Sequence, residues 1–235
     1  MKTCIISGAS KGIGRAIAIE LSKSERSIEK FILISRSITE LEKTKGFMDT
    51  SSLVELYSID FANIEETQEQ LASLFKDNDA DILINCAGYV EPRSILETTI
   101  ENWETTFKVN VSSMFLITKE AVKTMKSSGG KIINISSTAG MSARPGWSAY
   151  AASKAAVINF SETLSEELKE YGIKVYCVSP GRCATDLRKK LAPNEDPSTI
   201  MQPEDIAGVV RSLIPASGDF LDGQNIVVRQ QVKSY

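Results

Sequence analysis

The stretch that decides the fold is TCIISGASKGIGRAIAIEL, residues 3–21. Its first part, 3–7, is apolar and rich in β-branched residues, as is typical of a strand buried on both faces. After the glycines, apolar residues recur at helical spacing and predict a helix over 12–24. A strand, a glycine-rich turn and a helix in direct succession are typical of the opening of a parallel α/β fold.

Three of the chain's 14 glycines lie in the turn between this strand and helix. Gly8 allows a sharp exit from the strand, Gly12 lets backbone N–H groups approach a pyrophosphate, and Gly14 lets the helix pack on the sheet. The spacing is GxxxGxG rather than GxGxxG, and a tight turn without a ligand would also use glycines. We expect a dinucleotide to be held here by Gly8, Ser10, Lys11, Gly12, Ile13 and Gly14.

Strand-like and helix-like segments alternate almost to the end of the chain. Apolar runs predict strands at 3–7, 30–35, 53–59, 81–85, 131–135, 173–179 and 225–228. Helical periodicity predicts helices at 12–24, 63–77, 101–126, 149–171 and 203–214, and less clearly at 38–46. We therefore expect an α/β fold in which residues 1–235 form a single Rossmann-like, doubly wound domain, with a seven-stranded parallel sheet flanked by helices on both faces.

Composition excludes several classes of protein. The 235 residues include no histidine, which excludes Ser-His-Asp hydrolases and His-ligated zinc enzymes, and we expect no metal. A net charge of −3 argues against nucleic acid as a partner.

No apolar run has the length of a membrane span or a signal-peptide core, and the cysteines show no CxxC spacing. We expect a cytoplasmic protein without a membrane partner, in which Cys4 and Cys177 are buried as small apolar residues.

Residues 182–203 interrupt the alternation of strands and helices. This segment, RCATDLRKKLAPNEDPSTIMQP, holds three of the chain's seven prolines and a cluster of mixed charges. It follows the predicted strand 173–179, and ligands of α/β proteins bind at the carboxyl ends of strands. We interpret it as a substrate lid; the alternative is a tolerated surface insertion.

Small or polar residues also follow other predicted strands, at what would be the same edge of the sheet. These residues are Asn85, Ala87 and Gly88 after 81–85, Ser136 and Ser137 after 131–135, and Pro180, Gly181 and Thr185 after 173–179. Tyr150 and Lys154, at positions i and i+4, place a phenol and an ammonium on one helix face. Such a pair is weak evidence alone, but in a chain without histidine it offers a proton donor beside a ligand-binding edge.

The second predicted strand indicates which nicotinamide cofactor the turn would hold. It ends Ile34-Ser35-Arg36, without the carboxylate that an NAD site uses to bind the ribose hydroxyls. Arg36 and Lys11 could instead flank a 2′-phosphate, so we predict NADP(H) rather than NAD(H). Asp60, after the third strand, could accept a hydrogen bond from the adenine amine; the alternative is a helix cap before Asn63.

Taken together, SGASKGIG (7–14), NCAG (85–88), KVNV around Asn110, ISS (135–137), YAASK (150–154) and SPGRCAT (179–185) resemble the short-chain dehydrogenase/reductase family, in its NADP-preferring form. The resemblance covers nearly the whole chain. It implies a seven-stranded sheet, hydride transfer between a nicotinamide and a carbonyl or alcohol, and a catalytic tetrad at Asn110, Ser137, Tyr150 and Lys154.

The resemblance also implies a role for each of these residues. Tyr150 would donate the proton, with its pKa lowered by Lys154 and the oxidised nicotinamide. Lys154 would also hold the nicotinamide ribose, and Ser137 would polarise the substrate oxygen. Asn110 would hold a water linking Lys154 to solvent, although a polar residue that bends the helix is the alternative. Contacts to the carboxamide are expected from Thr185 and the backbone near Cys183.

The substrate is not specified by these patterns. A pocket lined by Val90, Ala139, Met141, Trp147 and 182–190 suggests an apolar carbonyl compound, an aldehyde or ketone. The cations Arg182, Arg188, Lys189 and Lys190 leave open an anionic substrate such as a pentulose phosphate. Two competing hypotheses are a cofactor-retaining epimerase or dehydratase and a non-catalytic NADP(H) sensor. The resemblance implies a homo-oligomer, a dimer or a tetramer, although the C-terminal NIVVRQQVKSY lacks the glycine pair found in many relatives.

Overall fold

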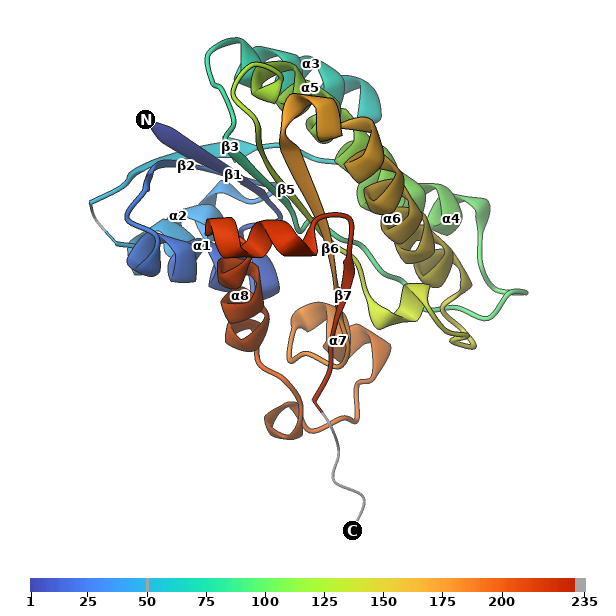
Figure 1. Cartoon of the computed structure of the whole chain (residues 1–235). Helices are drawn as coiled ribbons and strands as arrows, with labels where there is room; N and C mark the ends of the chain where they lie inside the picture. The colour runs from blue at the N-terminus through green and yellow to red at the C-terminus, as the bar shows by residue number, and fades with distance from the viewer. Residues whose placement is uncertain (50, 231–235) are drawn as a thin grey trace.

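In a computed structural model that describes residues 1–49 and 51–230, seven parallel strands form one sheet in the order β3-β2-β1-β4-β5-β6-β7 (Figure 1). The strands are β1 (Lys2–Ser7), β2 (Ile28–Ser35), β3 (Leu53–Ser58), β4 (Ile82–Asn85), β5 (Gly130–Ile135), β6 (Ile173–Pro180) and β7 (Asn225–Val228). The predicted α/β fold and seven-stranded parallel sheet are confirmed. The strand order reverses between β1 and β4, and a crevice opens at such a point.

Helices cover both faces of the sheet because the central strands are apolar on both sides (Figure 1). One face packs against α1 (Gly12–Ser24), α2 (Ile38–Phe47) and α8 (Pro203–Ser212) through residues such as Ile17, Leu41 and Ile206. The other face packs against α3 (Ile64–Lys76), α5 (Ser113–Met125) and α6 (Ser148–Glu167) through residues such as Leu71 and Ile117. None of the helices in the described part of the chain is long and apolar enough to cross a membrane.

The predicted helix 101–126 is interrupted in the structure. It consists of α4 (Ile100–Phe107), a π-helical turn (Lys108–Ser112) and α5. Asn110 lies in the π turn, and its side chain bonds to the backbone of Tyr89 and to Ser153 Oγ. These partners lie outside the helix, so helical periodicity does not reveal them, and π turns of this kind occur often at functional sites.

The segment 182–203 is more ordered than its composition indicates. It contains α7 (Asp186–Leu191) and a short 3-10 turn (Pro197–Thr199). The Thr185 side chain caps α7 by accepting a hydrogen bond from the Arg188 N–H. At the base, Ala184 N–H donates to the Met201 carbonyl over 2.8 Å, which ties the two ends of the segment together.

Candidate active site

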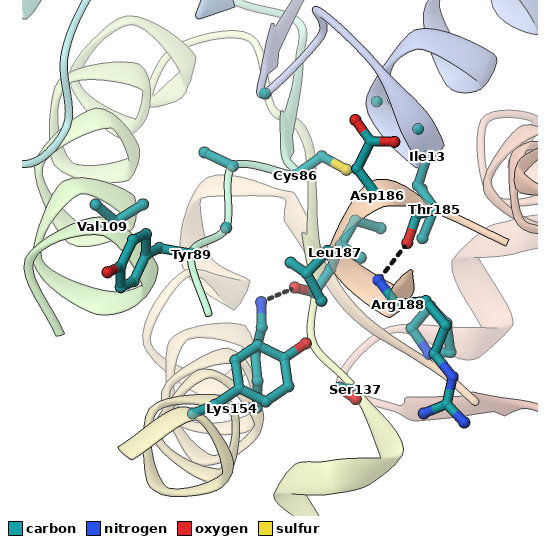
Figure 2. Close-up of a pocket in the computed structure, with 18 of the residues that line it drawn as sticks. Ile13, Cys86, Tyr89, Val109, Ser137, Lys154, Thr185, Asp186, Leu187 and Arg188 are labelled. Carbon is teal, nitrogen blue, oxygen red and sulfur yellow. Dashed lines mark hydrogen bonds between the residues drawn. The ribbon is translucent and has the colours of Figure 1, made fainter. Parts of the chain in front are cut away.

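A cavity of about 910 Å³ lies at the carboxyl ends of the central strands, beneath α7 (Figure 2). A cavity of this size is large enough for a ligand bigger than a single substrate molecule. Of the residues that the sequence predicts to bind cofactor or substrate oxygen, all line this cavity except Asn85 and Asn110. Residues far apart in the sequence are therefore brought into one site.

The glycine-rich turn leaves its backbone open toward this cavity. Gly8 and Gly12 adopt positive φ angles of 71° and 55°, which favour glycine. A Cβ on Gly8 would lie 2.6 Å from the backbone nitrogen of Ala87, and one on Gly14 would collide with the Gly8 carbonyl. Because Lys11 precedes α1 and its side chain makes no capping bond, the first N–H groups of α1 are available to an anion.

The charges at the adenosine end differ in part from the prediction. Arg36 is exposed at the cavity, but Lys11 Nζ forms an ion pair with Asp186 Oδ2 at 2.8 Å, which lowers the pKa of that carboxyl. Glu40 also lines this end, and no pattern in the sequence pointed to it. Arg15 pairs with Glu40 at 2.9 Å, so this carboxylate is already neutralised.

Asp60 lines the cavity without capping a helix. Its carboxylate accepts a hydrogen bond from the Ala62 N–H at 3.1 Å, while Asn63 is the residue that caps α3. The interpretation of Asp60 as a helix cap is therefore wrong. Its contact with an adenine amine stays a prediction.

Tyr150 and Lys154 lie one turn apart on α6, and both are buried at the cavity (Figure 2). Lys154 Nζ donates a hydrogen bond to the Ile135 carbonyl at 2.9 Å and lies 5.9 Å from the centre of the Tyr150 ring. The Lys154 backbone carbonyl accepts from Ser136 Oγ at 2.7 Å. Contacts at both ends of the residue therefore fix the ammonium beside the phenol.

Burial controls the pKa of both groups. It raises the pKa of Tyr150 to about 12, although the Ser137 hydroxyl and Arg188 oppose the shift, and it lowers the pKa of Lys154. Lys154 is not among the groups that lower the pKa of Tyr150 in this structure, and the lowering expected from Lys154 together with the oxidised nicotinamide stays a prediction. The ammonium is directed to the Ile135 carbonyl, and desolvation of the phenol outweighs the opposing effects of Ser137 and Arg188.

Ser137 lies at the end of β5 and lines the cavity. Its hydroxyl oxygen accepts a hydrogen bond from the Ala139 N–H at 3.1 Å. The hydroxyl proton is not used in this bond. Ser137 therefore caps the local backbone, and its proton can be donated to the Tyr150 oxygen, whose pKa it lowers, or to a ligand oxygen.

Asn85 and Asn110 belong to buried polar networks rather than to the cavity wall. Asn85 Nδ2 donates to Thr118 Oγ1 and Asn134 Oδ1 between the sheet and the helices. The Asn110 side-chain amide donates hydrogen bonds to Ser153 Oγ and to the Tyr89 carbonyl, and its oxygen accepts one from the Tyr89 N–H. These bonds fix the loop after β4 to α6. The predicted cofactor contact of Asn85 and the predicted water held by the Asn110 side chain are therefore not supported by their positions.

An apolar cluster lies on the Tyr150 side of the cavity. Its members Ala139, Trp147, Tyr150, Leu187 and Leu191 line the cavity, whereas Val90 packs behind them and does not occupy its predicted position in the pocket. Met141 was expected in this wall but is 46 % exposed and does not line the cavity. Lys189 and Lys190 are also exposed away from the cavity, so neither they nor Met141 occupy the predicted position.

The two lid arginines at the cavity are paired within the lid. Arg188 Nε lies 2.6 Å from Glu195 Oε2, and Arg182 lies 3.2 Å from the same carboxylate. Glu195 was not identified from the sequence, because its role depends on how the lid folds back. An anionic substrate would have to compete with this carboxylate.

All four cysteines are free, and two of them line the cavity. Cys4 and Cys177 are buried in the sheet, as predicted. Cys86 and Cys183 line the cavity, and burial raises the pKa of each thiol to about 12. The thiols are therefore protonated near neutral pH and are poor nucleophiles.

A phosphate-binding turn and a buried Tyr-Lys pair in one α/β crevice define a dinucleotide-dependent oxidoreductase. Residues 2–196 match the family described as short chain dehydrogenase, and the chain belongs to that family. The similar proteins include a 3-oxoacyl-[acyl-carrier-protein] reductase from Synechocystis, 32 % identical over 97 % of this chain and 95 % of that protein. A chloroplastic NADPH-dependent aldehyde reductase-like protein from Arabidopsis thaliana is 33 % identical over 97 % of this chain and 92 % of its own length.

A solved structure of an actinorhodin polyketide ketoreductase variant with NADPH has the same fold. Its TM-score is 0.85 at 24 % identity, over 97 % of this chain and 95 % of that one. The family match and the reductases among its curated relatives make the chain an enzyme of the oxidoreductase class that acts on CH–OH and carbonyl groups.

Proposed function

We propose that the protein is an NADPH-dependent carbonyl reductase, or in reverse an alcohol dehydrogenase, that acts on a ketone or aldehyde. The observation that carries the proposal is the position of Tyr150, Lys154 and Ser137 in the same cavity as the open glycine-rich turn. The whole chain acts as one catalytic domain with 182–203 as its lid, and the family favours a homo-oligomer.

The cavity fits a dinucleotide along its length. The N-terminus of α1 and the glycine turn would hold the pyrophosphate, and Arg36 would hold the 2′-phosphate. Asp60 would contact the adenine, and Gly88 and Thr185 would lie beside the nicotinamide. When bound, the cofactor supplies the hydride that reduces the carbonyl carbon.

The residues of the chain supply orientation and the proton. Ser137 would donate a hydrogen bond to the substrate oxygen and so polarise the carbonyl. The Tyr150 hydroxyl would transfer its proton to that oxygen as the alcohol forms. Lys154 would hold the nicotinamide ribose and stabilise the phenolate that the transfer leaves.

The proposal is tested by following NADPH absorbance with a panel of aldehydes, ketones, diketones and sugar phosphates. Oxidation of NADPH that depends on a carbonyl compound supports the proposal. Tight NADPH binding without turnover of any compound would instead support a non-catalytic sensor. Turnover confined to the sugar phosphates would support an anionic substrate, against which the Arg182–Glu195–Arg188 pairing argues.

We expect kcat/KM with NADPH to exceed that with NADH by at least about tenfold, because one charge-assisted hydrogen bond contributes roughly 1.5–3 kcal/mol. Arg36→Leu should remove most of this preference by weakening NADPH, and should leave NADH nearly unchanged. Steady-state kinetics with both cofactors make the comparison. Equal values for the unmodified protein would contradict the assignment of NADP(H).

The pKa of Tyr150, raised to about 12, predicts different pH profiles for the two directions. Reduction needs the protonated phenol, so its kcat/KM should stay level from neutral pH to about pH 9. Alcohol oxidation needs the phenolate, so its kcat/KM should rise with pH until the phenol of the enzyme–cofactor complex is ionised. Initial rates in both directions over this range provide the test, and a fall in oxidation with rising pH would contradict it.

A further inference from the structure

Leu187 is the lid residue that lies against the predicted reacting groups. It belongs to α7, lines the cavity (Figure 2) and packs against the cluster formed by Val90, Ala139 and Tyr150. Its Cδ1 atom is 3.7 Å from the position that a Cβ on Gly88 would occupy. A single side chain from the lid therefore packs against the cluster that contains Tyr150 and approaches the loop after β4.

Contacts on both sides of Leu187 fix its direction. Asp186 is paired with Lys11 of the glycine-rich turn at 2.8 Å. Arg188 is paired with Glu195, and its guanidinium lies 5.9 Å from the centre of the Trp147 ring. Since these residues flank Leu187 directly, the N-terminal half of α7 is attached both to the phosphate-binding turn and, through Arg188, to Glu195 and Trp147.

The surroundings of Leu187 indicate the chemistry of the group it would meet. The neighbouring wall is formed by Ala139, Trp147 and Leu191, with Val90 packed behind it. The cation next to Leu187 in the chain, Arg188, is already paired with a carboxylate. A substrate portion beside Leu187 would therefore be apolar and uncharged, and its size would be limited by the space between the leucine and Tyr150.

We infer that Leu187 is a specificity-determining residue, which restricts the enzyme to carbonyl compounds whose substituent beside the reacting carbon is compact, apolar and uncharged. This inference rests on the proposed function, because it assigns a substrate class to the same cavity. A larger substituent would have to displace the leucine, and with it the contacts of Asp186 and Arg188.

The test compares 2,3-butanedione with 1-phenyl-1,2-propanedione, which present a small and a bulky apolar substituent. In NADPH-dependent assays, Leu187→Ala should shift the kcat/KM ratio toward the phenyl compound by at least about tenfold, the effect of a few methylene groups in an apolar pocket. Leu187→Phe should shift the ratio the other way. Leu96→Ala makes the same chemical change at a side chain that is 96 % exposed, and it should leave the ratio unchanged.

Each outcome has a distinct meaning. A general loosening of the lid in Leu187→Ala would lower kcat/KM for both diketones and leave their ratio unchanged, which would overturn the inference. A strong preference of the unmodified enzyme for 2-oxobutanoate would overturn the uncharged class. If no carbonyl compound of the panel is reduced, the proposed function fails. Calorimetric binding of both diketones to the NADP⁺-loaded proteins still tests Leu187 through the same ratio.

Discussion

Replacement of Tyr150 by phenylalanine is expected to reduce kcat for carbonyl reduction by about a thousandfold, within the range that general acid catalysis contributes. The change removes only the hydroxyl from a ring that is buried against Val90 and Ala139, so the wall of the cavity is kept. The Kd for NADPH, measured by fluorescence titration, should stay within about twofold. Kinetics and binding together separate loss of the proton donor from loss of the site.

Tyr171→Phe is the matched control for this experiment. Tyr171 lies in the 3-10 turn after α6, far along the chain from the cavity-lining residues of that helix, and it does not line the cavity. Its kcat should equal that of the unmodified protein. Substantial turnover by Tyr150→Phe would remove Tyr150 as the proton donor, and water or another acid in the cavity would have to take its place.

Burial of Tyr150 and the ammonium of Lys154 make different contributions to the proposed mechanism. Burial makes the phenol a weak acid, which suits a group that must remain protonated until the substrate oxygen gains charge. The ammonium of Lys154 is then needed most after proton transfer, when a buried phenolate would otherwise lack a partner. Because stabilising the phenolate also lowers the pKa of the phenol, we expect the pKa of Tyr150 to fall below about 12 when cofactor and substrate are bound and Lys154 acts on the phenolate.

Much of the fold could be predicted because local pattern and tertiary burial agree. The helix predicted at 12–24 begins and ends where α1 does, and the strand predicted at 225–228 matches β7. These elements are bounded by glycines or polar turns, and their apolar periodicity matches the layers they join. The helix predicted at 101–126 was wrong in its middle, since the π turn depends on the bonds of Asn110 to a separate loop.

The errors at the site have two different physical origins. Asn85 could have been assigned correctly, because side chains alternate along a strand and Asn85 shares its face of β4 with the buried Leu83. The Lys11–Asp186 pair could not have been found in this way. It joins residues 175 positions apart, and only the folded lid brings them together.

Replacement of Lys154 by methionine is expected to lower kcat/KM at least about a hundredfold and to weaken NADPH binding about tenfold, the effect of losing one charge-assisted hydrogen bond. Methionine keeps an unbranched stem of similar length in the buried space, while the donor to the Ile135 carbonyl is lost. Unlike Tyr150→Phe, this change should therefore affect binding and chemistry together. Steady-state kinetics and fluorescence titration measure the two effects.

Two further variants show whether the charge or the packing of Lys154 is responsible. Lys23→Met removes an exposed ammonium near the end of α1 and should change neither quantity. Lys154→Arg keeps a cation, so it should recover part of the NADPH affinity that Lys154→Met loses. Because its planar group is larger, it should recover a smaller share of kcat. A Lys154→Met protein with normal kcat would mean that the phenolate is stabilised without the ammonium. The Tyr-Lys pair would then position the ligand and take no part in the proton transfer.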